Sequence, residues 1–301
     1  MSLISKYSEI LHENIINQKN EDSILEIITK NDSKNRVQIA QYYKATYNVS
    51  LFDEIKSKIG GDFGYCAAQT FLSPLEFCIH HLIIGLEKSK ECVLEQLTSK
   101  TKEELRLIED CYNKITRKDL KKEIIKIFED DIGKNLLNLW DIKRAYNINP
   151  DKKECEKYAN ILAKNDPNTW IENETIFKNI FLQRSPEELI LIARYYLKIT
   201  GINLIDDIEN NTEGNIKLLL KEILYNNITP QELFAEKIYL VLKGIGNDEE
   251  TLSRVLVSRC ELDISDIKDI YQKKYKKNLK EDVMDNTLGT YHKLCIFLCE
   301  K

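Results

Sequence analysis

A four-fold internal repeat is the feature that most constrains the fold of this chain of 301 residues. Four tyrosines, at spacings of 69, 84 and 75 residues, are each followed eight residues later by a leucine. The tyrosines are Tyr43, Tyr112, Tyr196 and Tyr271, and the leucines are Leu51, Leu120, Leu204 and Leu279. A repeat of this kind sets the architecture, because each copy forms the same unit and packs against its neighbours.

The segments around these tyrosines predict helices throughout. An apolar-periodic stretch such as SILEIIT or TLSRVLV precedes a polar break, NDSKN or RCELD, where Ser or Asp is able to cap the next helix. The next helix carries IAQYY or IKDIY, a short helix carries LFDEI or LKEDV, and a last helix closes the unit. Ten glycines, five prolines and no alternating β-branched runs also favour an almost wholly helical protein.

Charge and hydropathy exclude several classes of protein. The formal net charge of -5 argues against a nucleic-acid-binding protein, which is usually basic. No apolar run reaches the roughly 18 residues of a membrane-spanning helix, and the N-terminus lacks the pattern of a signal peptide. We therefore expect a cytoplasmic protein without a transmembrane segment.

Catalytic and metal-binding motifs are absent from the sequence. The four histidines are scattered, and no phosphate-binding loop or placed nucleophile is found, so we predict that the chain is not an enzyme. The eight cysteines lack zinc-ligand spacing and are interpreted as reduced core residues. Cys295 and Cys299, four apart on one predicted helix face, are a weaker metal or redox alternative.

A glycine-rich corner joins two apolar helical stretches near the C-terminus. It reads LKGIGND over residues 242–248, with glycines at 244 and 246. Glycine accepts the positive φ angles that turn backbone carbonyls outward, and outward carbonyls bind hard cations such as calcium. The corner is thus a candidate calcium site.

Residues 235–301 as a whole resemble the fourth repeat of an annexin, and the same five-helix order recurs in all four repeats. The resemblance implies an all-α fold, a curved disc of four annexin-like repeats with five helices each. The expected repeats are residues 1–72, 73–145, 146–228 and 229–301. It further implies calcium sites in which loop carbonyls join an acidic residue 40 positions after the second glycine, together with water and lipid phosphate.

In this sequence the implied calcium ligands are eroded. The acidic position holds Lys58 in repeat one, Ile127 in repeat two and Asn211 in repeat three, and only repeat four keeps both glycines. The implied ligands of repeat four are Leu242, Gly244, Gly246, Asn286 and, as a neighbouring substitute, Asp285. Asn286 offers one neutral oxygen where a carboxylate offers two charged ones, so we expect weak calcium binding, in repeat four only.

The resemblance also implies docking on acidic phospholipid, at the inner membrane face. The expected contacts are Trp170, Ile245, Lys273, Lys274, Lys276 and Lys277. Trp170 matches a position that swings out to the membrane in some annexins, and buried packing is its alternative. The lysines are expected on a helix that contacts anionic lipid, a filament or a sulfated polysaccharide, with a solvated helix face as the alternative.

A second function follows from the eroded loops and the start of repeat one almost at residue 1. Both features resemble the alpha-giardin branch of annexins. That branch implies a calcium-independent cytoskeletal or protein scaffold as the alternative to membrane docking.

Overall fold

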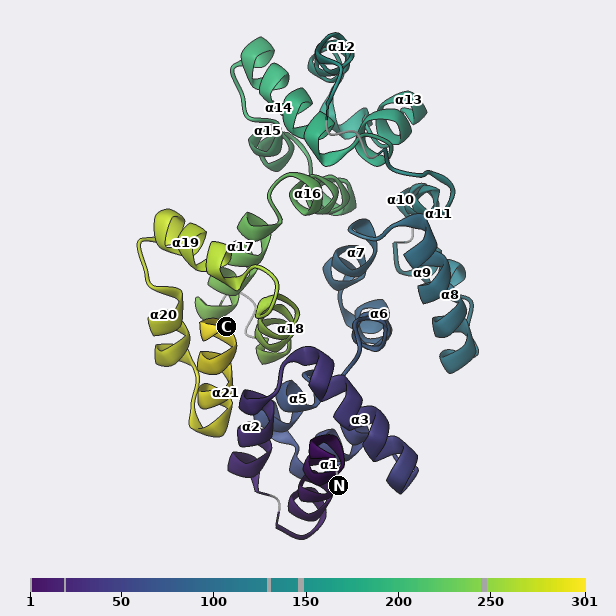
Figure 1. Cartoon of the computed structure of the whole chain (residues 1–301). Coiled ribbons are helices and arrows are strands. Elements are labelled where there is room, and N and C mark those ends of the chain that lie inside the picture. Colours follow the sequence, from purple (N-terminus) through teal and green to yellow (C-terminus); the bar gives the residue numbers. More distant parts are fainter. Residues whose placement is uncertain (1, 19, 129–130, 146–148, 245–247) are drawn as a thin grey trace. The chain divides into compact units, whose positions relative to one another are not determined.

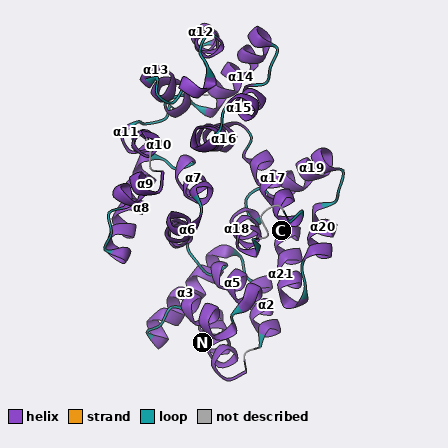
Figure 2. Cartoon of the chain, turned by 180° about the vertical axis from the view of Figure 1, so that it is seen from behind, coloured by secondary structure: helices purple, strands orange, loops and turns teal. Residues whose placement is uncertain are grey.

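The computed structural model describes residues 2–18, 20–128, 131–145, 149–244 and 248–301. Within these ranges every regular element is a helix, as Figure 2 shows, which confirms the predicted all-α class. The chain divides into two compact units, Met1–Phe77 with Gln231–Lys301, and Cys78–Pro230. None of the described helices is long and apolar enough to cross a bilayer.

The first unit combines the two ends of the chain (Figure 1). Its N-terminal helices are α1 (Leu3–Glu13), η1 (Asn14–Gln18), α2 (Glu21–Lys30), α3 (Ser33–Tyr47), α4 (Leu51–Glu54), η2 (Ile55–Ile59) and α5 (Gly61–Gln69). Its C-terminal helices are α17 (Pro230–Leu242), α18 (Glu249–Arg259), α19 (Ile264–Tyr275), α20 (Leu279–Asn286) and α21 (Gly289–Glu300). Helix α5 packs against α18 and α21, so one hydrophobic core joins the two sets.

The second unit holds the middle of the chain. Its helices are α6 (Pro74–Lys88), α7 (Lys90–Thr98), α8 (Lys102–Thr116), α9 (Leu120–Phe128), α10 (Asp131–Leu136), α11 (Asn138–Asp141), α12 (Lys152–Ala163), η3 (Pro167–Thr169), α13 (Glu174–Ile176), η4 (Phe177–Leu182), α14 (Pro186–Thr200), α15 (Leu204–Asn211) and α16 (Gly214–Ile228). Helix α16 packs against α7 and α14. The unit borders fall close to the expected borders of repeats two and four, and the division into four repeats stays a prediction.

The repeated tyrosines mark a recurrent local structure. Each is buried in the third helix of its repeat, and five residues later that helix ends in a left-handed residue. These residues are Asn48, Arg117, Gly201 and Lys276. Two residues further on, a polar side chain accepts from a backbone amide and caps the next helix, which begins with the buried leucine. The polar caps are Ser50, Asp119, Asn203 and Asn278.

An acidic residue eleven positions after each tyrosine lies in the fourth helix. The Tyr271 hydroxyl donates to Asp282 Oδ2 at 2.6 Å, and the same bond joins Tyr43 to Glu54 and Tyr196 to Asp207. Burial, and then the neighbouring carboxylate, raise the pKa of Tyr271, so this phenol remains a neutral donor. These bonds fix the fourth helix against the third in three of the repeats.

The cysteines lie where core residues are expected. Seven of the eight are buried, Cys111 is half-buried, and no disulfide joins any of them. Burial raises the pKa of the Cys78 thiol to about 11 and that of Cys299 to about 12, which keeps both thiols protonated. Cys295 and Cys299 are buried in α21, in line with core packing.

Candidate calcium and membrane site

The glycine corner of repeat four begins as the sequence predicts. Helix α17 ends at Leu242, and Gly244 has a φ of +73°. The backbone amide of Lys243 donates to Tyr239 O at 3.0 Å, and that of Gly244 donates to Val241 O at 3.0 Å. These two bonds satisfy carbonyl groups at the C-terminal end of α17, and the chain changes direction at Gly244.

The rest of the corner falls partly outside the described residues. Gly246 and Ile245, an expected calcium ligand and an expected membrane contact, belong to residues 245–247, which the structure does not describe. Asp248 caps α18, accepting from the backbone amide of Glu250 at 3.0 Å and from the Thr251 hydroxyl at 2.6 Å. The carboxylate of Asp248 is therefore committed to the helix cap.

The connection between α20 and α21 lies at the same end of α18 as this corner. The Tyr291 hydroxyl, in the first turn of α21, donates to Glu249 O at 3.2 Å and lies 3.0 Å from the Ser253 hydroxyl. Both partners belong to the first turns of α18, so residues 286–289 are held beside the start of that helix. The fold thus brings the two segments of the expected calcium site to one end of the helix bundle.

Asn286 and Asp285 occupy the exposed last turn of α20. Asn286 Nδ2 donates to Asp282 O at 2.7 Å, so the amide nitrogen, which cannot bind a cation, is used within the helix. The described residues contain no group of three or more His, Cys, Asp or Glu side chains placed to hold a metal ion. A cation here would depend mainly on backbone carbonyls and one amide oxygen, and the strength of calcium binding stays a prediction.

The carboxylate of Asp282, one turn before Asn286 in α20, is already engaged within the fold. It is 6% exposed, accepts from Tyr271 and forms an ion pair with Lys277, whose Nζ lies 2.8 Å from Oδ1. Burial acts to raise the pKa of Asp282, but the bonds from Lys277 and Tyr271 outweigh it and hold the pKa below the usual value. Asp282 therefore serves the helix packing. Its role was not predicted from the sequence, although the eleven-residue spacing was visible there.

The lysine run does not lie on one helix, which corrects the sequence-based expectation. Helix α19 ends at Tyr275, and Lys276 has a φ of +57°, so the run turns a corner. Lys273, Lys274 and Lys276 are all exposed. Lys274 is paired with Glu236 at 2.9 Å, and Lys277 is paired with Asp282. Half of the run is thus neutralised by carboxylates of its own unit.

The sequence of this chain is similar to those of known proteins. The sequence profile described as Annexin matches residues 8–66 and 233–298. Annexin A5 of Cynops pyrrhogaster is 30% identical over 287 residues, which cover 93% of this chain and 87% of that protein. The chain belongs to the annexin family. The family is non-enzymatic, which confirms the prediction that this annexin is not an enzyme.

Other relatives agree on family and fold. Human (Homo sapiens) annexin A13 is 29% identical over 282 residues, covering 93% of this chain and 89% of that protein. The solved structure of annexin III covers all of this annexin and 94% of its own chain, with a TM-score of 0.88 at 27% identity. The calcium-bound structure of alpha-14 giardin has a TM-score of 0.80 at 17% identity, with 99% of this chain and 100% of that chain covered. The likeness to the giardin is one of fold alone, and the alpha-giardin branch stays a prediction.

Among the described residues of repeats one and two, no open glycine corner is found. Repeat one has the π-helix η1 in this place, and Lys58 lies exposed in η2. In repeat two Gly85 lies inside α6, where an added Cβ would be 3.1 Å from both the amide nitrogen and Cγ2 of Val93. Gly85 therefore permits close packing of α6 on α7. That role could not be separated from a calcium-loop role by the sequence.

Repeat three closes its loop with a hydrogen bond. Asn168 Nδ2 donates to Asn211 O at 2.7 Å and to Asp166 Oδ1 at 3.0 Å. The first of these bonds joins the loop directly to the end of α15, across the place where the family resemblance puts the ion. This contact agrees with the expectation that repeat three lacks a calcium site, which stays a prediction.

Trp170 is fully buried. It therefore packs in the core, as one of the two alternatives predicted, and does not lie at the surface as a membrane contact would. Its exposed fraction is 0%, and its ring packs edge-on against Tyr196 with centroids 6.1 Å apart. The indole Nε1 donates to Asn165 O at 3.1 Å. Moving the ring to a bilayer would break that bond and empty the core beside Tyr196.

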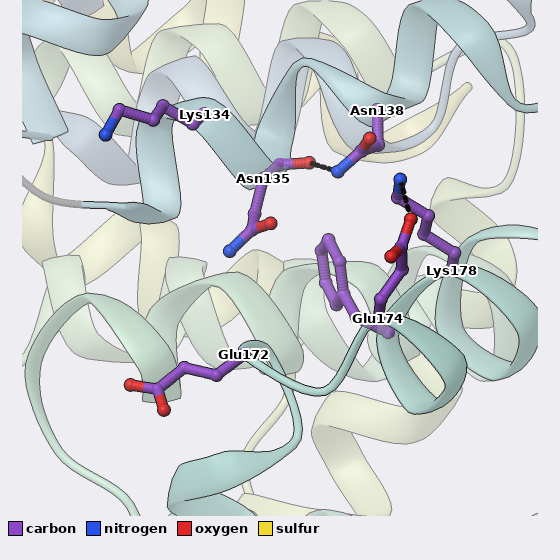
Figure 3. A pocket seen from close by; sticks show the side chains of 7 residues that line it. Lys134, Asn135, Asn138, Glu172, Glu174 and Lys178 are labelled. Atoms are coloured by element: carbon purple, nitrogen blue, oxygen red, sulfur yellow. Dashed lines mark hydrogen bonds and ion pairs between the residues drawn. The ribbon is translucent and has the colours of Figure 1, made fainter.

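A polar cavity of about 360 Å³ lies in the second unit (Figure 3). It is lined by Lys134, Asn135, Asn138, Glu172, Glu174, Phe177 and Lys178. The Lys178 ammonium points to the Glu174 carboxylate, and Asn138 Nδ2 donates to Asn135 O at 2.9 Å. Two ammonium and two carboxylate groups balance one another, so the cavity has no marked preference for a cation or an anion.

Proposed function

We propose that this annexin docks peripherally on acidic phospholipid at the inner membrane face, through the loop end of repeat four, with a weak dependence on calcium. The observation that carries the proposal is the turned glycine corner at Gly244, held at the same end of α18 as Asn286. Annexin membership supports the membrane target. The neutral amide at Asn286 supports the weak dependence on calcium.

Calcium would supply positive charge for a lipid phosphate at this corner, and residues of the chain would hold it. The chain would supply the carbonyls of Leu242, Gly244 and Gly246 and the side-chain oxygen of Asn286, with Asp285 as a neighbouring carboxylate. Millimolar calcium is the expected range, since affinity rises with the number of charged ligands and this set has few.

The test restores the missing charge. Asn286→Asp should tighten calcium binding about tenfold and strengthen calcium-dependent sedimentation with phosphatidylserine vesicles, because it adds a charged, two-oxygen ligand. Adding Gly244→Val should remove that gain, because a β-branched residue resists a φ of +73° and turns the carbonyls away. Equal calcium affinity in the wild type and Asn286→Asp, measured by isothermal titration, would contradict the proposed site.

The alternative is a calcium-independent scaffold for cytoskeletal filaments, another protein or a sulfated polysaccharide. The closed loops of repeats two and three favour a loss of calcium dependence. Vesicle sedimentation that is absent both with calcium and with chelator, combined with co-sedimentation with filaments, would support this alternative over membrane docking.

A further inference from the structure

A pair of buried hydroxyl groups distinguishes repeat four from the other repeats. Ser253 in α18 and Tyr291 in α21 are 0% and 6% exposed, and their hydroxyl oxygens lie 3.0 Å apart. They lie 18 residues before and 20 residues after the repeated tyrosine, Tyr271. None of the residues at the same spacings in the other repeats has a hydroxyl group. These residues are Leu25 and Phe63 in repeat one, Leu94 and Ile132 in repeat two, and Lys178 and Ile216 in repeat three.

Stability alone does not account for this buried pair. A buried hydroxyl group must keep its hydrogen bonds, whereas replacing two bonded polar groups by apolar groups of matching shape costs little or nothing. Repeats one and two have apolar residues at both positions. The contacts that the two hydroxyl groups make therefore indicate their role.

The Tyr291 hydroxyl joins the starts of two helices. It donates to Glu249 O, in the first turn of α18, at 3.2 Å. Its one proton is used in this bond, so in the 3.0 Å contact the Ser253 hydroxyl donates to the Tyr291 oxygen. Burial raises the pKa of Tyr291, which keeps the phenol protonated and able to donate. The start of α21 is thereby fixed beside the start of α18.

A second set of contacts continues from α21 to Asn286. The hydroxyl of Thr287, the residue after Asn286, donates to Val283 O in α20 at 2.7 Å. Its oxygen lies 3.2 Å from His292 Nδ1, in the first turn of α21. Polar contacts therefore run from the first turn of α18, through the first turn of α21, to the last turn of α20, where Asn286 lies.

We propose that Tyr291, held by Ser253, is a positioning residue for the calcium site of repeat four. It fixes Asn286 relative to the start of α18, which follows the glycine corner in the chain. An ion held by two chain segments binds more tightly when their separation is fixed beforehand, because less conformational entropy is lost on binding. The positioning role rests on the proposed calcium site and adds no ligand to it.

Tyr291→Phe tests this role, because it removes the hydroxyl group and keeps the ring. Ser253 would then donate to Glu249 O, four residues earlier in α18, so its hydroxyl keeps a partner and the fold should be retained. Isothermal titration of the full chain with calcium chloride should give an affinity about fivefold below that of the wild type, the factor that corresponds to one hydrogen bond. The same loss should appear when Tyr291→Phe is added to Asn286→Asp.

Tyr196→Phe is the matched control. The Tyr196 hydroxyl donates to Asp207, and both residues belong to the second unit. This variant loses a hydrogen bond of the same kind, so a general loss of stability would affect both variants. Its calcium affinity should equal that of the wild type.

Hydrogen exchange without calcium gives a second measurement. In Tyr291→Phe the amides of residues 287–292 should exchange faster than in the wild type, because the first turn of α21 loses its bond to α18. Tyr196→Phe should leave the exchange of these amides unchanged.

The outcomes separate the positioning role from the proposed function. A loss of calcium affinity in Tyr291→Phe but not in Tyr196→Phe, together with faster exchange of residues 287–292, would support the positioning role. If Asn286→Asp tightens calcium binding but Tyr291→Phe leaves either affinity or exchange unchanged, or Tyr196→Phe weakens binding equally, the positioning role is wrong and the calcium site stands. If calcium binds to neither the wild type nor Asn286→Asp, both proposals are wrong.

Discussion

Arg36 offers a direct test of how the two ends of the chain are joined in one unit. It is 2% exposed in α3 of repeat one, and its Nη2 donates to Glu261 Oε1 of repeat four at 3.1 Å. Its Nε donates to Thr70 O at 2.9 Å and its Nη1 to Asn31 O at 2.6 Å. Arg36→Ala removes all three bonds together.

The expected cost of Arg36→Ala follows from the groups left behind. Thr70 and Asn31 are 3% and 5% exposed, and each buried carbonyl left without a donor costs about 1 kcal/mol or more. Glu261, whose side chain is 26% exposed, would also lose a charge-assisted bond. Together with lost packing of the arginine stem, the free energy of unfolding should fall by about 3 kcal/mol, within the range for breaking a buried ion pair.

Urea unfolding followed by circular dichroism measures this loss, and hydrogen exchange locates it. Amides in α2, α3 and the start of α19 should lose protection in Arg36→Ala, while amides of residues 78–230 serve as an internal reference. Lys34→Ala, at an exposed position of the same helix, should change stability by less than about 0.5 kcal/mol. A loss below about 1 kcal/mol in Arg36→Ala would refute the reasoning from orphaned carbonyls.

Two further predictions concern packing and acid stability. Gly85→Ala should lower the free energy of unfolding by about 1 to 3 kcal/mol, because the new Cβ would lie 3.1 Å from Val93 N. It should leave calcium binding unchanged. A loss of calcium binding in titration would contradict the packing role. Asp282 has a lowered pKa in the folded state, so its contribution to stability is full above its unfolded pKa and disappears as pH falls through the folded pKa. Tyr271→Phe removes one donor to Asp282 and should raise the pH at which acid unfolding begins; an unchanged midpoint in a pH titration by circular dichroism would contradict this.

Local structure was largely predictable from the sequence. The tyrosine and leucine spacing, the polar caps and the apolar periodicity all depend on residues fewer than about a dozen positions apart, and helix formation is governed at that range. The glycine at 244 was expected to have positive φ because few other residues adopt it readily, and its φ is +73°. The replacement of the acidic ligand by Asn286 was equally plain from the residue itself.

What a side chain contacts across the fold was decided only by tertiary structure. Arg36 and Glu261 are 225 positions apart, and no local pattern marks them as partners. Burial of Trp170, pairing of Lys274 and Lys277, and the packing role of Gly85 each depend on which helix face meets a neighbour. Leu288 shows the opposite outcome. An apolar residue of this type is expected to be buried, yet its exposed fraction in the fold is 86%. Free energies of burial and pairing are set by surroundings that long-range packing creates, so they cannot be read from residue type and spacing alone.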